Sequence, residues 1–573
     1  MTTGTLTRLG SGTRSAVGAQ PRLALVAAAI GVVALGFRLA HYFGNASLRL
    51  DESRLALNVA IRSWAGLLQP LDYDQTAPPV FLWLQKAAIL AGGVNEFALR
   101  LPALLPGVLC VLLIYIVARR IAGNMAAVLA AGVAALSPLL IHYSTDAKPY
   151  SLDVVATLGL VYLGLDWSDA PASPRAAARI ALAGAVAVWA STPAIFVLAG
   201  ISTVLCFAPA GARPPPARLA AVGCAWAASF AVVYVLVYRP AAASPYMQSY
   251  WADSLLTLWH PHLLARAWQG IRDLVWQLFF GGTTEPPVST DESLMISAGS
   301  AAMLVLGAVG LRYLAQSRRQ AMLLLVSPMA VALCASMLGL YPVAARVMLF
   351  TAPSLIVPVA VAASRLAWAP SASKALRSAT RFAGLVLLLP PLKRDLLLAG
   401  HPIAFEHVRP AVAEFRRRAL PGEPIYVFTG SLPAWTFYTT DWRAPDLNRL
   451  ARAAHLGGSG GAAFENIPPR GRAVGTENDG LVFPLGATRE ILGAGHGAWW
   501  RSASGLLQDH PDPGWAAAEA RRIRAAANPS VWLLVSHSYR LELFIYPELE
   551  RLGGRLELAH GADGVVLRRY RFP

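Results

Sequence analysis

Long apolar runs follow one another through the first 400 residues, and short polar connections separate them. A bilayer requires about 20 apolar residues for each helix that crosses it, or somewhat fewer where flanking side chains reach back to the interface. Only 14% of the 573 residues are charged, whereas soluble domains carry about a quarter. We therefore expect a mainly α-helical, polytopic membrane protein. About eleven spans are predicted, at residues 23–42, 101–118, 124–142, 151–166, 177–191, 193–210, 218–238, 296–314, 321–340, 346–364 and 382–399.

The distribution of basic residues predicts the orientation of these spans. Lysine and arginine accumulate in cytoplasmic connections, and with a cytoplasmic N-terminus every second connection is basic. The net charge of +17 comes from these scattered residues and forms no single stripe, so we expect the lipid bilayer as a partner and no nucleic acid. The basic residues of these connections are Arg119, Arg120, Arg175, Arg213, Arg318, Arg319, Arg365, Lys374, Arg377 and Arg381.

Two apolar segments are predicted to lie on the outer surface. The run at 80–91 is about 12 residues long, which is too short for a span, and counting it would invert every later connection. The long loop at 239–291 carries apolar residues at helical spacing from Leu264 to Leu278, with polar residues between them. Both are therefore expected to be interfacial helices.

The first apolar run lacks a convincing cleavage site and is read as a retained span.

The composition becomes polar after about residue 400. Helical stretches alternate there with short apolar strands at 425–428 and 531–535, a pattern that predicts an α/β domain. We therefore expect a transmembrane domain at 1–400 and an extracytoplasmic α/β domain at 401–573. The glycine-rich pieces at 457–461 and 493–497 do not join a strand to a helix as a nucleotide-binding loop does, and are predicted to be flexible loops.

The cysteines and histidines do not indicate a metal site or a disulfide framework. All four cysteines lie inside apolar runs, where they are expected to act as small buried hydrophobic residues. His260 and His262 have no third ligand nearby in the sequence. No metal and no other cofactor is predicted.

Two adjacent acids, Asp51 and Glu52, follow the first span directly. In a helix, Asp51 and Arg54 share one face and Glu52 is rotated by about 100°. Charge next to lipid is costly and often functional, so Asp51 is a candidate general base for an acceptor hydroxyl and Glu52 a candidate orienting group. The alternative is structural, because acids also favour the first turn of a helix.

Asp72 and Asp74 lie two residues apart before a Pro-Pro break. In an extended loop their side chains would point the same way and could hold a cation. A solvated loop is the alternative.

Several polar residues are predicted to lie on the same membrane side as Asp51. Lys148 is suited to a phosphate, and Asp146, at the outer end of the third span, is a second carboxylate. Arg346 stands at the outer entrance of a later span and can pair with a phosphate, or it can be an anchor that reaches the interface.

Four motifs in this order resemble the C-type glycosyltransferase superfamily. These polytopic enzymes include protein O-mannosyltransferases and bacterial aminoarabinose transferases. The resemblance covers roughly residues 20–400, and the C-terminal domain looks like those appended to some bacterial relatives. The motifs are LDESRLALN at 50–58, DQTAPPVFLWLQ at 74–85 with NEFALRLPAL at 95–104, HYSTDAKPYSLDV at 142–154, and LYPVAARVMLF at 340–350.

The resemblance implies an inverting transfer of a sugar, a hexose or a pentose, from a polyprenyl phosphate to a glycan, lipid or protein acceptor. The reaction would occur on the outer face of a bacterial cytoplasmic membrane. Asp51, with Glu52, corresponds to the family's Asp-Glu pair at the reaction centre. Some relatives carry a lysine where this chain has Ala77, so the phosphate would fall to Lys148, Arg346 and Lys86. The residues expected at the acceptor or sugar are Arg54, Asp74, Asp146, Tyr150 and Tyr341.

Two other classes of function are compatible with many spans and a few buried charges. A lipid or polysaccharide transporter would show repeated halves with broken helices at mid-membrane, but no such repeat is evident. A non-catalytic envelope assembly protein would tolerate replacement of Asp51.

Overall fold

The chain divides into two units, and each is built from several separate segments. The first comprises residues 1–44, 103–233 and 251–401, and the second comprises 45–102, 234–250 and 402–573. The computed structural model describes residues 11–281, 290–368, 373–375, 377–378, 389–397, 406–420, 423–440, 442–443, 491–493, 513–536, 542–562 and 564–573.

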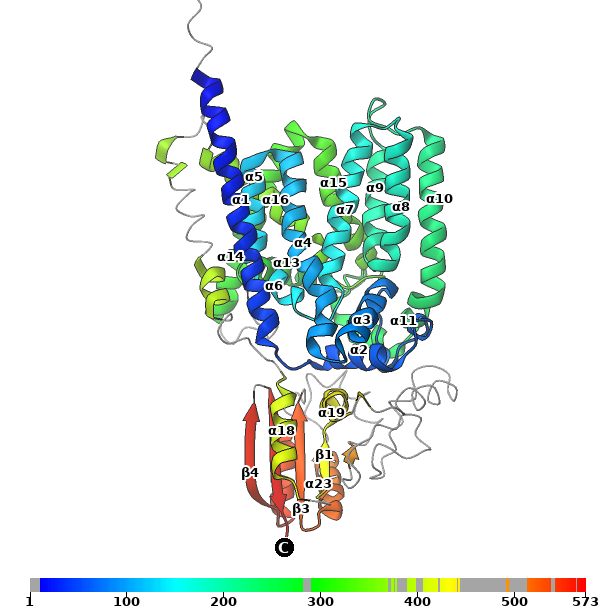
Figure 1. Ribbon diagram of the computed structural model, residues 1–573, viewed down its shortest axis with the longest axis vertical. Coiled ribbons are helices and arrows are strands. Elements are labelled where there is room, and N and C mark those ends of the chain that lie inside the picture. The colour runs from blue at the N-terminus through cyan, green and yellow to red at the C-terminus, as the bar shows by residue number, and fades with distance from the viewer. Residues whose placement is uncertain are drawn as a thin grey trace, which may run out of the picture. The chain divides into compact units, whose positions relative to one another are not determined.

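The first unit is a bundle of long apolar helices (Figure 1). The helix α4 begins in the second unit and continues into this one. The helices are α1 (Ser11–Gly44), α4 (Glu96–Ala122), α5 (Asn124–Leu136), α6 (Pro138–Ser144), α7 (Tyr150–Asp169), α8 (Pro174–Ala190), α9 (Ala194–Cys206), α10 (Pro216–Val233), α13 (Leu263–Phe279), α14 (Thr290–Ser317), α15 (Arg319–Met337) and α16 (Ala352–Trp368).

Six helices of the described residues have the length and hydropathy of a membrane span: α1, α4, α10 with its continuation to Ala242, α14, α15 and α16 with the turn before it. The pair α5 and α6, bent by 60°, adds a seventh if it is counted as one span. The predicted spans at 151–166, 177–191 and 193–210 are also helices, but α8 and α9 have only 17 and 13 residues. Half of the predicted span 382–399, at 382–388 and 398–399, lies outside the described residues, so the count of eleven stays a prediction.

A buried arginine explains how the chain tolerates the break between α5 and α6. Pro138 has no N–H, so it cannot donate to the carbonyl of Ala134 four residues earlier. Arg38 of α1 is fully buried and donates to Ala134 O at 3.2 Å and to Ala135 O at 3.4 Å. Its Nε also donates to Gly107 O of α4 at 2.8 Å. The guanidinium therefore satisfies buried carbonyls that the break would otherwise leave without a hydrogen bond.

Helices α14 and α16 approach each other closely at Gly310. A Cβ atom at this position would overlap the carbonyl oxygen of Pro358. Gly310→Ala is therefore expected to lower the free energy of unfolding by about 1–3 kcal/mol, although alanine is the better helix former. At Gly307 on the same helix, an added Cβ would meet only Val359 Cγ2 at 3.8 Å. Gly307→Ala should leave the thermal unfolding midpoint in detergent unchanged, and equal effects of both substitutions would contradict this close approach.

The second unit contains the short helices that follow the first span. The interfacial helix predicted at 80–91 is present as a helix, α3, in this unit. The one predicted at 264–278 is present as α13, in the first unit. Their interfacial location stays a prediction. The elements of this part are α2 (Leu50–Ile61), η1 (Gly66–Leu68), η2 (Asp72–Asp74), α3 (Pro79–Gly92), η3 (Tyr234–Tyr238), α11 (Arg239–Ala242) and α12 (Pro245–Trp251).

The C-terminal part of this unit holds a five-stranded sheet in the order β2-β1-β3-β5-β4. β1 (Ile425–Val427) is parallel to β2 (Ile491–Gly493) and to β3 (Ser530–Ser536), with Ile425 opposite Trp532. β5 (Val565–Arg571) is antiparallel to β3 and to β4 (Arg555–Ala562). The strands predicted at 425–428 and 531–535 are confirmed as β1 and β3.

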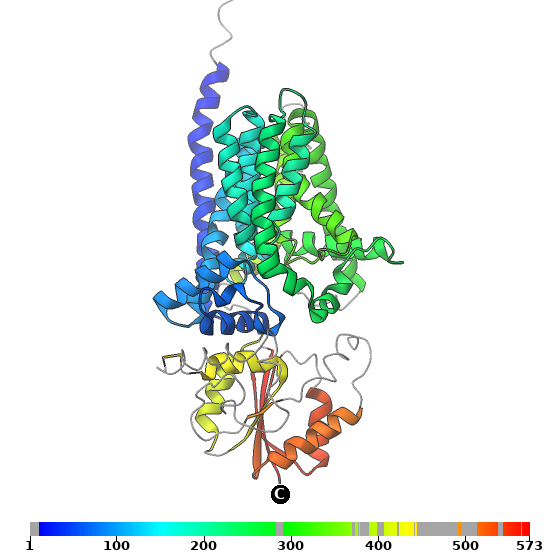
Figure 2. The same cartoon turned by 90° about the vertical axis from the view of Figure 1, so that its right-hand side faces the viewer.

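Helices cover both faces of this sheet (Figure 2). α18 (Val408–Arg418) and α19 (Leu432–Thr439) pack on one face, and α23 (Pro513–Ala526) and α24 (Glu542–Arg551) on the other. β3 is buried along its whole length, as expected for a strand covered on both faces. The glycine-rich segment 457–461 and most of 493–497 lie outside the described residues.

Candidate active site

The helix α2 starts immediately after an extended residue, Arg49. Glu52 Oε2 accepts a hydrogen bond from the backbone N–H of Arg49 at 3.0 Å, and Ser53 Oγ donates to Leu50 O at 2.9 Å. The bond to Glu52 satisfies the N–H of the residue that caps the helix, and the bond from Ser53 adds a contact within the first turn. They explain why the sequence DES begins a helix here.

Glu52 is buried and forms a two-pronged ion pair with Arg100 of α4. Arg100 Nε donates to Oε1 at 2.9 Å and Nη2 donates to Oε2 at 2.8 Å. Burial would raise the pKa of Glu52, but the Arg100 charge and hydrogen bonds, together with Arg49, lower it. Arg100 also donates to the carbonyls of Ala46 and Ser47. Glu52 therefore fixes the start of α2, and its role as an orienting group stays a prediction.

Asp51 is half-buried, while Glu52 and Arg54, which follow it in α2, are buried. The guanidinium of Arg54 lies 5.8 Å from the centre of the Tyr73 ring, a distance at which cation and ring attract each other. Of the two adjacent acids, Asp51 is thus the one that keeps access to its surroundings. The separate environments agree with the different orientations that helical spacing predicts.

Asp72 and Asp74 do not lie in an extended loop, as the sequence suggested, but in the 3₁₀ turn η2. The side chain of Asn58 accepts from Asp72 N at 2.9 Å and donates to Asp72 O at 3.2 Å, which holds the turn against α2. Asp72 Oδ2 pairs with Arg62 Nη2 at 2.7 Å, and both side chains are buried. The expected pair of parallel carboxylates is therefore absent in this turn.

Asp74 is held in an uncommon backbone conformation. Tyr73 and Asp74 have φ values of 62° and 53°, the left-handed region that non-glycine residues seldom adopt and that is often found at functional sites. Asp74 Oδ1 accepts from Ser244 Oγ at 2.6 Å. The two acids of this turn thus have different partners, and the backbone that carries Asp74 is strained.

The side chain of Lys86 binds the C-terminal end of α2. Its Nζ donates to Val59 O at 3.0 Å and to Ala60 O at 3.1 Å, in the last turn of α2. Burial lowers the pKa of this ammonium group. A cation at this end of a helix stabilises it.

The remaining predicted residues belong to the first unit. Asp146 and Lys148 are buried in the turn between α6 and α7, where Lys148 N donates to Asp146 O at 2.7 Å. The ring of Tyr150 packs edge-on against Tyr143 with centroids 4.8 Å apart. Lys148, Asp146 and Tyr150 therefore form one local group at the start of α7.

The second group of the first unit lies before α16. The guanidinium of Arg346 lies 5.0 Å from the ring centre of Trp251, and Tyr341 donates from its hydroxyl to Val347 O at 2.8 Å. Phe196 packs edge-on against Tyr341. The turn η5 (Leu349–Thr351), which follows Arg346, packs against α7.

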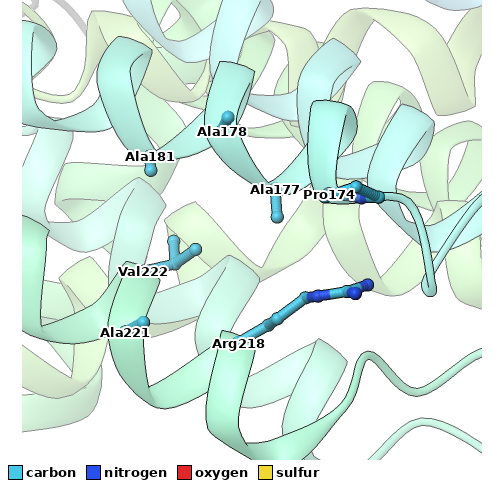
Figure 3. A pocket seen from close by; sticks show the side chains of 7 residues that line it. All are labelled: Pro174, Ala177, Ala178, Ala181, Arg218, Ala221 and Val222. Atoms are coloured by element: carbon cyan, nitrogen blue, oxygen red, sulfur yellow. The ribbon is translucent and has the colours of Figure 1, made fainter.

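A metal centre and a pocket are two further kinds of site that the described residues could form. No three His, Cys, Asp or Glu side chains among them come together as metal ligands would. A shallow groove of about 250 Å³ between α8 and α10 is lined by alanines, Pro174, Val222 and Arg218 (Figure 3). It includes none of the predicted site residues.

Sequence reasoning missed Arg100, Arg62 and Asn58. A signal existed for Arg100, because an arginine in the first turns of an apolar span needs a partner. Asn58 and Arg62 lie among apolar residues of one helical stretch, but the sequence does not show that Asp72 is their partner.

Part of the sequence and the fold of the chain are similar to those of known proteins. Residues 76–238 match the model of the dolichyl-phosphate-mannose-protein mannosyltransferase family. The structure of ArnT from Cupriavidus metallidurans bound to undecaprenyl phosphate is similar with 14% identity and a TM-score of 0.47, over 97% of this chain and 98% of that one. No curated protein matches the sequence.

An oligosaccharyltransferase from Archaeoglobus fulgidus, tethered to an acceptor peptide with the NVT sequon, shares the fold. Identity is 13% and the TM-score is 0.50, over 95% of this chain and 74% of that one. The archaeal AglB from the same organism, in complex with an inhibitory peptide and a dolichol-phosphate, gives 13% and 0.48 over the same shares of the two chains.

The chain is thus a polytopic membrane protein with the C-type glycosyltransferase fold and a small C-terminal sheet domain. Within the chain, residues 76–238 are similar to the dolichyl-phosphate-mannose-protein mannosyltransferase family.

Proposed function

We propose that this protein is an inverting glycosyltransferase that moves a sugar from a polyprenyl-phosphate donor to a glycan, lipid or protein acceptor. The reaction would take place on the outer face of a bacterial cytoplasmic membrane, where the C-terminal domain would also lie. The observation that carries the proposal is the match of residues 76–238 to a family that is named for a dolichyl-phosphate-linked sugar. ArnT with undecaprenyl phosphate and AglB with dolichol-phosphate supply the comparison for the donor.

Asp51 is assigned the role of general base. Its half-buried carboxylate sits on a helix whose start is fixed by the Glu52–Arg100 pair, and a rigid element places a base more accurately than a loop does. As the acceptor oxygen attacks the anomeric carbon, Asp51 would take its proton. The bond from that carbon to the phosphate oxygen breaks on the opposite face, so the configuration of the sugar inverts.

The leaving phosphate needs positive charge as the bond breaks. Lys148 and Arg346 are assigned this role, since Lys86 is engaged with the last carbonyls of α2. Arg54, Asp74, Asp146, Tyr150 and Tyr341 are assigned to the sugar or the acceptor. The scheme moves one proton and one glycosyl group and requires no redox cofactor.

The test is turnover of a panel of labelled polyprenyl-phosphate sugars, hexoses and pentoses, with a cell-envelope extract as acceptor and the purified protein in liposomes. We expect one donor to lose its sugar to the acceptor and the product to have the opposite anomeric configuration, read by NMR. Retention of configuration would overturn the single-step mechanism. Consumption of no donor would overturn the proposed function.

A further inference from the structure

The backbone between the first span and α2 is not part of any helix, yet its polar groups are bonded. The entry segment comprises residues 45–49, which lie between the helices, and Leu50, the first residue of α2, and it leads directly into Asp51. Buried backbone N–H and C=O groups outside regular structure need other partners. Four such partners come from the C-terminal domain, which belongs to the same unit as the entry segment.

Two side chains of the C-terminal domain accept hydrogen bonds from the entry segment. Tyr438 of α19 accepts from Leu48 N through its hydroxyl at 2.7 Å. Glu406, just before α18, accepts from Leu50 N through Oε2 at 2.7 Å. Leu50 is the first residue of α2, so this carboxylate satisfies one of the helix's open N–H groups and faces its positive end.

His407 and Arg409 hold the earlier part of the segment. Ser47 Oγ lies 2.8 Å from His407 Nδ1 and accepts from Arg409 N at 3.1 Å. Arg409 Nη2 donates to Asn45 O at 2.6 Å.

Glu96 at the start of α4 ties the same side chains together. Its Oε1 accepts from Arg409 Nη1 at 2.5 Å and from the Tyr438 hydroxyl at 3.0 Å. Because Tyr438 accepts from Leu48 N and donates to Glu96, its hydroxyl uses both functions at once. α19 also packs against α2.

From this bonding we propose that the C-terminal domain is a working part of the active site, and that Glu406 and Tyr438 are positioning residues for Asp51. The inference rests on the proposed function of Asp51 as the base. The two side chains fix the backbone at the residues directly before it, and a misplacement of a catalytic group by about 1 Å can cost about 100-fold in rate. Neither residue needs to touch the substrate.

The test compares Glu406→Leu, Glu406→Gln and Tyr438→Phe in the full-length protein. Glutamine keeps an oxygen that can accept from Leu50 N, whereas leucine and phenylalanine have none. Glu406→Leu and Tyr438→Phe are each expected to lower kcat per folded enzyme by at least about 10-fold, with the donor KM changed less than about twofold. Glu406→Gln should restore most of the rate.

Glu414→Leu is the matched control. Glu414 lies on α18 and pairs with Arg417 and Arg418 of the same helix, so its replacement should leave kcat unchanged. If Glu406→Leu and Tyr438→Phe altered only the folded fraction, and kcat per folded enzyme stayed at the wild-type value, the positioning role would be wrong.

Hydrogen exchange gives a readout that does not depend on turnover. Amides in the peptide 45–55 should exchange at least about 10-fold faster in Glu406→Leu and Tyr438→Phe than in the wild type, with α14 and α15 unchanged. Unchanged exchange in 45–55 would overturn the bonding on which the inference rests. If exchange rises but the wild type uses no donor, the proposed function fails, and with it the positioning role, while the link between the domain and α2 stands.

Discussion

Asp51→Asn is expected to slow sugar transfer by at least about 100-fold, the scale of losing a general base. Asparagine keeps the shape of the side chain and one acceptor oxygen but cannot take the proton of the acceptor hydroxyl. The loss should appear in kcat, with little change in the donor KM, because the proton moves only in the transition state. The measurement is steady-state release of labelled sugar from the donor found active in the panel.

A control with the same chemical change separates this effect from a general one. Asp253 has a highly exposed side chain paired with Arg266, and Asp253→Asn should transfer sugar at the wild-type rate. The Asp51 variant should also match the wild type in thermal unfolding. An Asp51 variant that is folded and fully active would show that the base is another residue, with Asp74 or Asp146 next to be tested.

The second large effect is on stability rather than on chemistry. Glu52→Leu leaves the buried guanidinium of Arg100 without its carboxylate, and removing one partner of a buried ion pair costs about 3–5 kcal/mol. The loss should be seen as a lower midpoint in denaturant unfolding in detergent micelles. Asp169→Asn removes a partner of Arg120 at the surface, where such pairs contribute about 0–1 kcal/mol.

The same pair predicts how stability depends on pH. Arg100 lowers the pKa of Glu52 in the folded protein from its ordinary value of 4.5 to about 2, despite burial. The unfolded state therefore binds the proton first as pH falls, and the contribution of Glu52 is complete above about pH 5 and is lost progressively towards pH 2. Glu52→Leu should unfold with a flatter dependence over this range. Equal pH dependence in both proteins would contradict the assignment.

The long apolar elements could be predicted because their signal is local. Length and hydropathy alone placed the helices now seen as α1, α4, α14, α15 and α16, and the apolar run at 531–535 predicted the strand now seen as β3. The orientation of Asp51 and Glu52 also followed from helical spacing over a few residues.

The site contacts could not be predicted in the same way, because they join residues far apart in the sequence. From the sequence, Lys86 looks like a free cation. In the structure its ammonium group donates to two carbonyls of α2, the nearer of them 26 residues earlier in the chain. Asp72 reads as a cation ligand in an extended loop, but Asn58 and Arg62 bend the loop and occupy the carboxylate. The spacing of two acids describes only their own segment, not the side chains that other segments bring to them.

The partners of the entry segment were beyond sequence reasoning for the same reason. Glu406 is 356 residues from Leu50, and Tyr438 is 390 residues from Leu48. Both lie in a polar domain whose composition gives no hint of an interaction with the residues after the first span.

This separation along the chain also sets an order of events during synthesis. At about 5–20 residues per second, the ribosome needs on the order of 20–70 seconds after making Leu50 before it reaches Glu406, 356 residues later. During that interval the newly inserted spans already carry Asp51, but the backbone before it lacks two of its acceptors. An incomplete chain in the membrane would thus hold Asp51, the proposed base, on a helix whose entry segment lacks these two contacts, so full competence for transfer would arrive only with the C-terminal domain.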